Sequence, residues 1–292
     1  MAEINIQKIQ SSKPIKEILE FCIINVDKPA GCTSFDTSEK IRKIFSGRKT
    51  GHFGTLDPMV TGVLPIALNR ACKLIGYFMH HDKVYIGKFR IHSDINQKEL
   101  ANQMEKFTGK IKQLPPVKSA VKREIRERTI NKFEIIKFNK KIIEFIADVE
   151  AGTYIRKLIS DLGDTIGGAH MTELRRIRAG IFDIKNSYSI SDIENAFEKF
   201  KKGDETELRR ILIPAEIISE ILPVVQVKEK NLKQILTGKP IFKKDIASSN
   251  FEKLEASKNV NLFVAFLKDR FIGVYRIINE GDVVAKAEFV MN

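Results

Sequence analysis

The residue best placed for chemistry in this sequence is Asp57, which lies in the stretch from Gly51 to Pro65. This stretch reads GHFGTLDPMVTGVLP, and its three glycines and two prolines specify an unusual backbone path that leads to an apolar segment. A carboxylate on such a constrained loop is held rigidly at the edge of a core, where it can act as a nucleophile or a general base. The alternative is that Asp57 only accepts backbone N–H bonds within its own turn, as an Asp before Pro often does.

Two arginine-containing segments are candidates for contact with an anion. Residues 150–159 read EAGTYIRKLI, in which a turn of small residues leads into an amphipathic helix with Arg156 in its first turn. A cation there opposes the positive end of the helix dipole, which indicates that a carboxylate or a phosphate lies close by. Residues 169–178 read AHMTELRRIR and place three arginines in four positions beside Leu174. We expect either a phosphate contact or the solvated face of a helix there.

The charge of the chain points to a polyanionic partner. The net charge is +13 with a pI near 9.5, and each phosphate that such a protein neutralises releases a condensed counterion. Residues 110–141 contain eleven Lys or Arg against three Glu, so the excess is concentrated in one stretch. Nucleic acid is therefore the expected partner, and the alternatives are an ordinary solvated face and a basic membrane-surface patch.

Other kinds of site find little support. The three cysteines form no CxxC pair, and His80 and His81 are adjacent in the chain, so we expect no disulfide framework, no metal site and no thiol enzyme. The cysteines are expected to be small buried or half-buried fillers. The first residues lack the basic and apolar regions of a secretory signal, and no apolar run is long enough to span a bilayer. We therefore expect a cytoplasmic protein.

The elements that must position these residues alternate between apolar strands and helices. Strands are predicted at residues 21–26, 63–68, 84–91, 133–138 and 142–149, the last two joined by a polar link. Helices are predicted from a cap at Thr33 or Ser34 to Phe45, at residues 96–107 and after Thr153. The alternation within residues 84–91 puts Tyr85, Gly87, Phe89 and Ile91 on one side. The pattern indicates an α+β fold built on a mixed, largely antiparallel sheet with flanking helices.

A second, smaller domain is predicted after Ile221. Helices near residues 191–201 and 204–213 lead into Pro214 and Pro223. Strands are then predicted at residues 224–227, 262–267 and 271–277, with a helix at residues 229–237 that ends at Gly238. We therefore divide the chain into residues 1–221 and a small β-rich domain at residues 222–292.

Taken together, these strings resemble the TruB family of pseudouridine synthases, and most closely its archaeal and eukaryotic dyskerin-like branch. The likeness is carried by the stretch around Asp57, by Lys28-Pro29, by GTYIR at residues 152–156 and by LPPVKSAVKR at residues 114–123. It implies a pseudouridine synthase catalytic domain over residues 1–221. In its placement and its helix-then-strands pattern, the part from residue 222 to 292 is similar to a PUA domain, an RNA-binding module.

The resemblance implies a role for each matching residue. Asp57 is the catalytic carboxylate, Tyr85 packs on the target base, and Arg156 pairs with the carboxylate. The residues implied in binding RNA or substrate are His52, Lys28, Pro29, Leu174, Tyr154, Lys118, Lys122 and Arg123. Among these, Lys28 and Pro29 belong to a motif that supports the catalytic loop. We also expect Arg156 to keep Asp57 ionised in a dry pocket, and the alternative for Tyr85 is a core filler.

The implied activity is the isomerisation of specific uridines to pseudouridine in tRNA, including uridine 55 of the TΨC arm, or in rRNA, with no cofactor and no metal. The base must leave its stack, detach from the ribose at N1 and rejoin through C5. Asp57 can add to C1′, add to C6 or remove a sugar proton, and the sequence leaves these routes open.

Three versions of this function are compatible with the sequence. Stand-alone bacterial members of the family carry RNA-binding elements after the position that matches Ile91, and this sequence has no obvious long insertion there. The resemblance therefore favours the catalytic subunit of a box H/ACA guide ribonucleoprotein, with guide RNA and accessory proteins as partners. The alternatives are a stand-alone tRNA pseudouridine-55 synthase and a non-catalytic RNA-binding scaffold. The joint presence of Asp57, Tyr85 and Arg156 argues against the scaffold.

Overall fold

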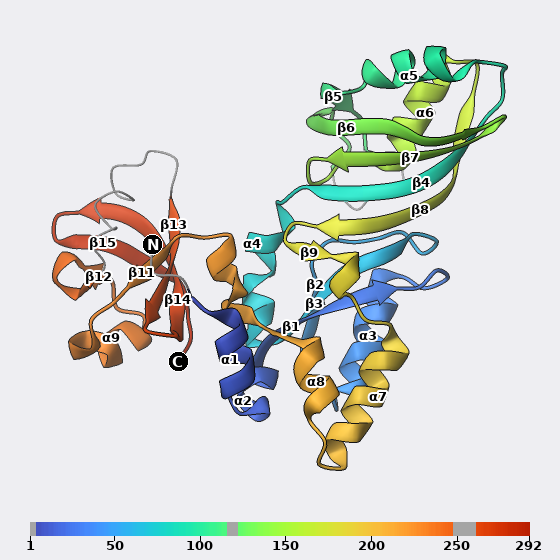
Figure 1. Cartoon of the computed structure of the whole chain (residues 1–292). Helices are drawn as coiled ribbons and strands as arrows, with labels where there is room; N and C mark the ends of the chain where they lie inside the picture. The colour runs from blue at the N-terminus through green and yellow to red at the C-terminus, as the bar shows by residue number, and fades with distance from the viewer. Residues whose placement is uncertain (1–3, 116–121, 248–260) are drawn as a thin grey trace. The chain divides into compact units, whose positions relative to one another are not determined.

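The computed structural model describes residues 4–115, 122–247 and 261–292 of the chain. Two compact units are present (Figure 1). The large unit consists of residues Ile24–Ile66 and Ile75–Glu198, and the terminal unit consists of Met1–Ile23, Ala67–Leu74 and Lys199–Asn292. The domain boundary that we placed after Ile221 stays a prediction. Within the described residues, none of the helices is both long enough and apolar enough to cross a membrane.

The large unit is built on one twisted sheet. Its strands are β1 (Phe21–Lys28), β2 (Thr50–His52), β3 (Thr61–Asn69), β4 (Lys83–Ile91), β5 (Gly109–Gln113), β6 (Arg126–Asn139), β7 (Ile142–Val149), β8 (Ala169–Ala179) and β9 (Phe182–Asp183). They follow the spatial order β1-β3-β8-β4-β7-β6-β5, with β2 paired to β3 and β9 to β8. The pair β3–β8 is parallel, and every step from β8 to β5 is antiparallel. The prediction of a mixed, largely antiparallel sheet is therefore confirmed.

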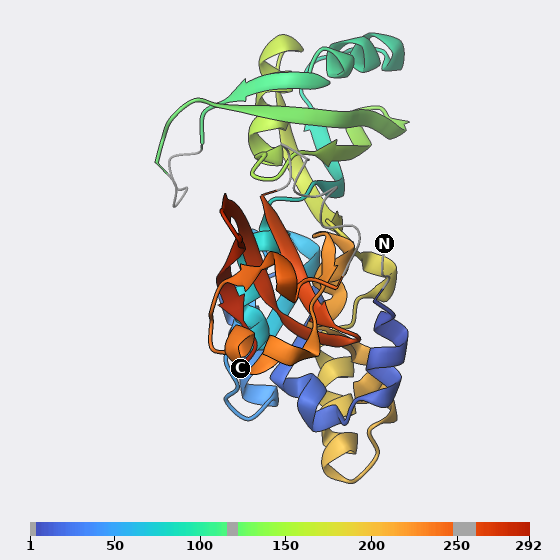
Figure 2. The ribbon, with the colours of Figure 1, turned by 90° about the vertical axis from the view of Figure 1, so that its left-hand side faces the viewer.

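Helices of the large unit cover this sheet and carry part of the site. They are α3 (Ser34–Ile44), α4 (Ile75–Met79), α5 (Gln97–Glu105), α6 (Ile155–Thr165), η2 (Ile184–Asn186) and α7 (Ile190–Lys201). α6 packs on β8, α5 packs on β6, and the two helices contact each other (Figure 2). α3 begins where predicted, because Thr33 and Asp36 form a capping box that satisfies two backbone N–H groups.

Most of the predicted strands and helices of the large unit are confirmed, and one is wrong. β7 has the predicted bounds, and along β4 the residues at alternate positions, Tyr85, Phe89 and Ile91, are buried as expected. The helix that we considered for residues 169–178 is wrong, because this segment is strand β8 between β3 and β4. Pairing on both edges satisfies its backbone and outweighs the helical preference of its Leu, Arg and Glu residues.

The terminal unit contains a second sheet near the end of the chain. The elements of the terminal unit are α1 (Ile6–Ser12), α2 (Ile15–Glu20), η1 (Arg70–Leu74), α8 (Thr206–Ile211), β10 (Leu212–Pro214), η3 (Ala215–Glu220), β11 (Val224–Gln226), η4 (Glu229–Asn231), α9 (Leu232–Leu236), β12 (Ile241–Phe242), η5 (Lys243–Asp245), β13 (Leu262–Leu267), β14 (Arg270–Glu280) and β15 (Val283–Val290). The sheet has the order β11-β13-β14-β15-β12.

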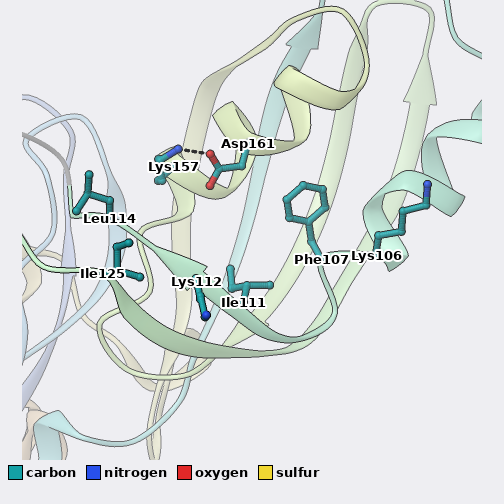
Figure 3. A pocket seen from close by; sticks show the side chains of 8 residues that line it. All are labelled: Lys106, Phe107, Ile111, Lys112, Leu114, Ile125, Lys157 and Asp161. Carbon is teal, nitrogen blue, oxygen red and sulfur yellow. Dashed lines mark hydrogen bonds and ion pairs between the residues drawn. The ribbon is translucent and has the colours of Figure 1, made fainter.

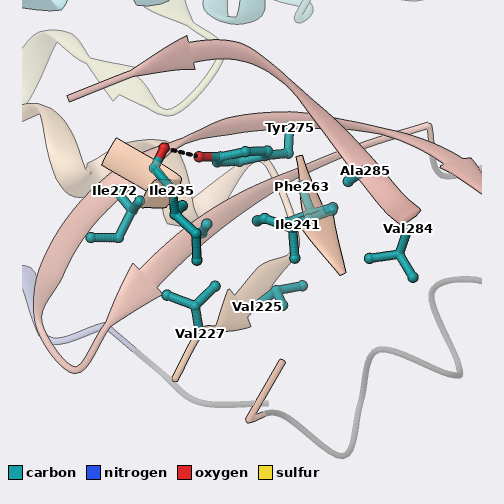
Figure 4. Packing of buried hydrophobic residues seen from close by; sticks show 10 residues of the cluster. Val225, Val227, Ile235, Ile241, Phe263, Ile272, Tyr275, Val284 and Ala285 are labelled. Carbon is teal, nitrogen blue, oxygen red and sulfur yellow. Dashed lines mark hydrogen bonds between the residues drawn. The ribbon is translucent and has the colours of Figure 1, made fainter. Parts of the chain in front are cut away.

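The core of the C-terminal sheet is apolar and close-packed. Buried side chains that include Ile235, Phe263 and Tyr275 meet inside it, and the hydroxyl of Tyr275 donates to the carbonyl oxygen of Ile235 (Figure 4). Burial raises the pKa of Tyr275 well above its usual range, so this hydroxyl stays protonated. A small β-rich module is therefore confirmed, although the strand from Val283 to Val290 was not predicted.

Candidate active site

The loop that carries Asp57 is held from beneath by the side chain of Lys28. The ammonium group of Lys28 is fully buried and donates to the carbonyl oxygens of Pro29, Pro58 and Val60 at 2.8, 3.0 and 2.9 Å. Burial lowers the pKa of Lys28, and the nearby Cys32 thiol and Asp57 carboxylate oppose that shift. Lys28 therefore supports the loop, as the resemblance implied, but its charge is not exposed for direct contact with RNA.

Further contacts fix the loop backbone at both ends. The hydroxyl of Ser34 accepts from the Leu56 N–H at 2.7 Å and donates to the Leu56 carbonyl at 3.1 Å. The buried guanidinium of Arg176 donates to the carbonyl oxygen of Val63 at 2.8 Å and to that of Gly54 at 3.4 Å. Gly62 has a φ of +101°, and a Cβ there would lie 2.1 Å from the Arg176 carbonyl oxygen. The loop thus has one backbone path, which presents Asp57 in a fixed place.

The carboxylate of Asp57 is paired with Arg156 in the first turn of α6. The distance between the Arg156 Nη2 atom and the Asp57 Oδ2 atom is 2.8 Å. The anion that we expected beside Arg156 is therefore this carboxylate, which also compensates the cation at the positive end of the helix. The chain alone does not form the expected dry pocket, because the two side chains are 56% and 48% exposed.

Strand register brings Tyr85 and Leu174 to one face of the sheet. On the pair β4–β8, Tyr85 lies opposite Arg176 and Gly87 lies opposite Leu174. Directly opposed residues project to the same side, so Tyr85 shares a face with Leu174 and with the Arg176 side chain that touches the catalytic loop. A bulge between Val84 and Tyr85 changes the register at this point, and bulges often redirect a side chain next to an active site. Both Tyr85 and Leu174 are 9% exposed.

His52 lies on β2, half-buried, just before the catalytic loop. Its Nδ1 atom is 3.2 Å from the Ser38 hydroxyl and its Nε2 atom is 3.4 Å from the Thr55 hydroxyl. Burial and the nearby Arg176 cation lower the pKa of His52, so its ring is neutral at pH 7. The ring is held in place and faces the loop with neutral nitrogens.

The three arginines of β8 have hydrogen-bond partners within the protein. Arg175 makes two hydrogen bonds to Asp27, at 3.0 and 2.7 Å, and Arg178 donates to Asp148 at 2.8 Å. Arg176 is buried beneath the catalytic loop. The solvated helix face is therefore wrong, because the segment is a strand, whereas a phosphate contact stays a prediction. The strand fold explains the burial of Arg176, because alternate side chains of β8 point into the sheet's packed face.

The remaining predicted RNA-binding residues lie on or near β5, β6 and α6. Lys122 and Arg123 are exposed ahead of β6, and Lys122 pairs with Glu124. Tyr154 is half-buried at the start of α6, and Lys118 lies outside the described residues. Part of the positive charge in residues 110–141 is paired within the protein, for example Lys110 with Glu127 at 3.1 Å.

Comparison with known proteins shows to which family this chain belongs. Residues 42–155 match the model of the TruB family pseudouridylate synthase N-terminal domain, and residues 156–219 match that of the tRNA pseudouridylate synthase B C-terminal domain. A relative from Korarchaeum cryptofilum named "Probable tRNA pseudouridine synthase B" is 37% identical over 279 residues, 94% of this chain and 85% of its own length. The chain belongs to the TruB family. It is therefore a pseudouridine synthase, as its sequence predicted.

Solved structures of this family extend the likeness to nearly the whole chain. The structure of a Cbf5-Nop10-Gar1 complex contains a chain that is 32% identical, with a TM-score of 0.86 over 96% of this chain and 88% of that one. An H/ACA ribonucleoprotein bound to a substrate RNA containing 2′-deoxyuridine contains another that is 29% identical, with a TM-score of 0.85 over 97% and 89%. The expected likeness to the dyskerin-like branch of the TruB family is thus confirmed.

Two residues that hold the catalytic loop of this TruB family member were missed as such in the sequence. Ser34 was recognised only as a possible helix cap, and Arg176 only as one of three arginines. Neither local pattern signals a contact with the loop, because each depends on which strand or helix packs beside it. An arginine at an alternate, core-facing position of a strand is the one signal that could have singled out Arg176.

Proposed function

We propose that this pseudouridine synthase uses Asp57, Arg156 and Tyr85 to isomerise uridine in RNA. The observation that carries the proposal is the 2.8 Å ion pair between Arg156 and Asp57, which joins the rigid glycine-rich loop to the start of α6. A flipped-out uridine that reaches this pair meets the Asp57 carboxylate, and the bound RNA then excludes water from it. The proposed site residues rest on this geometry together with the family membership.

The chemistry proposed for Asp57 is an intramolecular transfer. The bond between N1 of uracil and C1′ of ribose breaks, the base turns, and a bond between C5 and C1′ forms. The proton on C5 is then lost and N1 gains a proton, so that atoms and electrons balance without a cofactor or a metal. Addition of Asp57 to C1′, addition to C6 and removal of a sugar proton all use the carboxylate that Arg156 holds in place.

Two substitutions of Tyr85 distinguish the role of its ring in base stacking from the role of its hydroxyl group. Its ring lies on the same face of the sheet as Leu174, and the two would form the apolar walls of a uracil pocket. We expect Tyr85→Leu to lower kcat more than about 100-fold because the base loses its flat support, and Tyr85→Phe to separate the contribution of the hydroxyl. Single-turnover pseudouridine formation measures both. Activity of Tyr85→Leu equal to that of the wild type would mean that Tyr85 only fills the core.

For the biological role, we favour the catalytic subunit of a box H/ACA guide ribonucleoprotein. The proposal is supported by the likeness, over almost the whole chain, to the chains in the Cbf5-Nop10-Gar1 complex and in the H/ACA ribonucleoprotein bound to substrate RNA. The partners would then be guide RNA, target rRNA or tRNA, and accessory proteins of the kinds present in those complexes. Cytoplasmic localisation is part of this proposal.

A stand-alone tRNA enzyme is the second candidate. It is favoured by relatives named "Probable tRNA pseudouridine synthase B", five of which share 34 to 37% identity over more than nine tenths of this chain. In that role the chain would modify uridine 55 of the TΨC arm without a guide. A non-catalytic scaffold is a poorer match, because the Asp57–Arg156 pair is intact.

The two roles differ in what the purified chain does alone. It is incubated with tRNA and rRNA transcripts, with and without an H/ACA guide RNA and accessory proteins, and pseudouridine is mapped at nucleotide resolution. Modification that requires the guide supports the ribonucleoprotein role. Modification of tRNA by the chain alone supports the stand-alone role, and no product in any mixture from a folded protein contradicts both.

Residues 222–292 are proposed as a PUA-like module that binds RNA in either role. Its support is a compact β-rich fold with a run of exposed lysines around α9 and η5. These are Lys228, Lys230, Lys233, Lys239, Lys243 and Lys244. Exposed lysines that lie close together in the chain are suited to phosphate contacts.

A further inference from the structure

Gln113, the last residue of β5, makes an unusual contact with the start of α6. Its side chain is 2% exposed, which is rare for an amide unless it is fully hydrogen-bonded. Its Oε1 atom accepts from the Tyr154 N–H at 3.0 Å, and its Nε2 atom donates to the Tyr154 carbonyl at 3.3 Å. One side chain therefore binds both backbone groups of one residue, as a neighbouring strand would.

Tyr154 is the N-cap of α6, and Arg156 follows it by two residues. No side chain of its own segment caps this helix end, and the Tyr154 carbonyl also accepts the first helical bond, from the Leu158 N–H at 3.0 Å. Gln113 thus supplies from β5 a partner for the helix end that the local sequence does not provide. Because Arg156 lies within this first turn, the position of its backbone depends on the peptide that Gln113 holds.

The turn that precedes Tyr154 is also attached to a neighbouring strand, β6. The Glu150 carboxylate accepts from the Thr129 N–H at 2.9 Å and lies 3.6 Å from the Arg128 guanidinium. Gly152 has a φ of +82°, and a Cβ there would come within 3.1 Å of Arg128. The β5–β6 pair therefore fixes both the turn and the helix start, the former through Glu150 and the latter through Gln113.

Apolar packing between β5 and α6 is incomplete beside this contact. A cavity of about 450 Å³ lies between them, lined on one side by Ile111, Lys112 and Leu114 and on the other by Lys157 and Asp161 (Figure 3). Among the lining residues, Lys112 and Leu114 flank Gln113, and Lys157 directly follows Arg156 in the chain. The apolar face of α6 packs on β8, and on the side of the cavity the two hydrogen bonds of Gln113 join β5 to the start of the helix.

We infer that Gln113 is a positioning residue for the pseudouridine synthase reaction: it fixes the peptide at which α6 begins and so holds Arg156 against Asp57. The inference rests on the proposed catalytic roles of Asp57 and Arg156. We do not propose that Gln113 touches the substrate or the reacting atoms. Its effect on the reaction passes through Arg156.

A double-mutant cycle tests this inference. Single-turnover pseudouridine formation is measured at saturating RNA for Gln113→Leu, Arg156→Ala and the double variant, in whichever assembly the wild type is active. We expect Gln113→Leu to lower the rate constant about 10-fold, since small misplacements of a catalytic group slow reactions by such factors. In the Arg156→Ala background the same change should lower it about 2-fold or less, because its route of action is already lost. Gln97→Leu, an exposed glutamine at the start of α5, is the matched control.

A second variant protects the test against misfolding. In Gln113→Glu the neutral carboxyl group can still accept from the Tyr154 N–H and donate to its carbonyl, whereas the ionised form cannot donate. Lowering the pH should therefore raise the activity of Gln113→Glu relative to that of the wild type. Amide hydrogen exchange at residues 153–157 should be faster in Gln113→Leu and unchanged in Gln97→Leu.

The outcomes separate this inference from the proposed function. Independent, multiplicative losses in the cycle, or faster exchange with a normal rate constant, would overturn the role of Gln113 alone. Full activity of Arg156→Ala would overturn the role of Arg156 and that of Gln113 with it. An active Asp57→Asn protein would instead contradict the proposed catalytic centre.

Discussion

Asp57→Asn is expected to abolish pseudouridine formation while leaving the chain folded and able to bind RNA. The amide has the shape of the carboxylate but cannot become an anion, so it can neither add to the nucleotide nor accept a proton from the sugar. We expect a loss in the single-turnover rate constant of about 10³-fold or more, as is usual when the central catalytic group is removed.

The fold should tolerate this change because Asp57 contributes little to stability. Its partner Arg156 is 56% exposed and Asp57 itself is 48% exposed, and exposed ion pairs contribute about 0 to 1 kcal/mol. The loop is held by backbone contacts to Lys28, Ser34 and Arg176 that the substitution leaves in place. The free energy of unfolding, measured in urea, should therefore change by less than about 1 kcal/mol.

A matched control isolates the chemistry of Asp57. Asp164 is an exposed carboxylate near the other end of α6, and Asp164→Asn removes the same charge without touching the site. This control should keep full activity. Substantial pseudouridine formation by Asp57→Asn would exclude Asp57 as the catalytic carboxylate. Loss of activity in both variants would indicate a general effect of charge.

Local signals in the sequence were sufficient for the elements that frame the site. The cap at Thr33 starts α3, and the apolar alternation of residues 142–149 matches β7 residue for residue. The same period of two placed Tyr85 on one side of its strand with Phe89 and Ile91, and this side is buried. These features depend on neighbours in the chain, so a single sequence contains them.

Features that depend on tertiary contacts were not accessible in this way. Residues 169–178 have the composition of a helix, and only the flanking strands β3 and β4 make them a strand. The burial of Arg176 and its contact with Gly54 follow from that pairing. The contact of Gln113 with Tyr154 joins segments that are distant in the chain, and the sequence of neither segment predicts it.

The catalytic pair lies between these two cases. Physical reasoning indicated that an anion lies near Arg156, but the choice of Asp57 came from the family resemblance. The structure supplies the distance between them and shows that the pair is open to solvent. Solvent exposure could not be predicted, because it depends on where the end of α6 lies relative to the loop.

Arg156→Lys is expected to reduce turnover far more than stability, although it keeps the positive charge. Lysine is a compact, strongly hydrated point charge, whereas the planar guanidinium can hold a carboxylate in a defined orientation. At a site this exposed, water competes well for an ammonium group, so Asp57 should lose its orientation toward the nucleotide. We expect kcat to fall about 100-fold with a small change in RNA affinity, because an angular misplacement of the reacting group affects chemistry more than binding.

The equivalent substitution at a structural pair provides the comparison. Arg42 pairs with Glu39 at 2.8 Å on α3 and is 41% exposed, so Arg42→Lys makes the same chemical change in a similar environment outside the site. Both variants should lose less than about 1 kcal/mol of unfolding free energy, and only Arg156→Lys should lose activity. If Arg156→Lys kept full activity at equal stability, positive charge alone would satisfy Asp57. The geometry of the guanidinium, and with it any need for Gln113 to position the start of α6, would then have no part in the reaction.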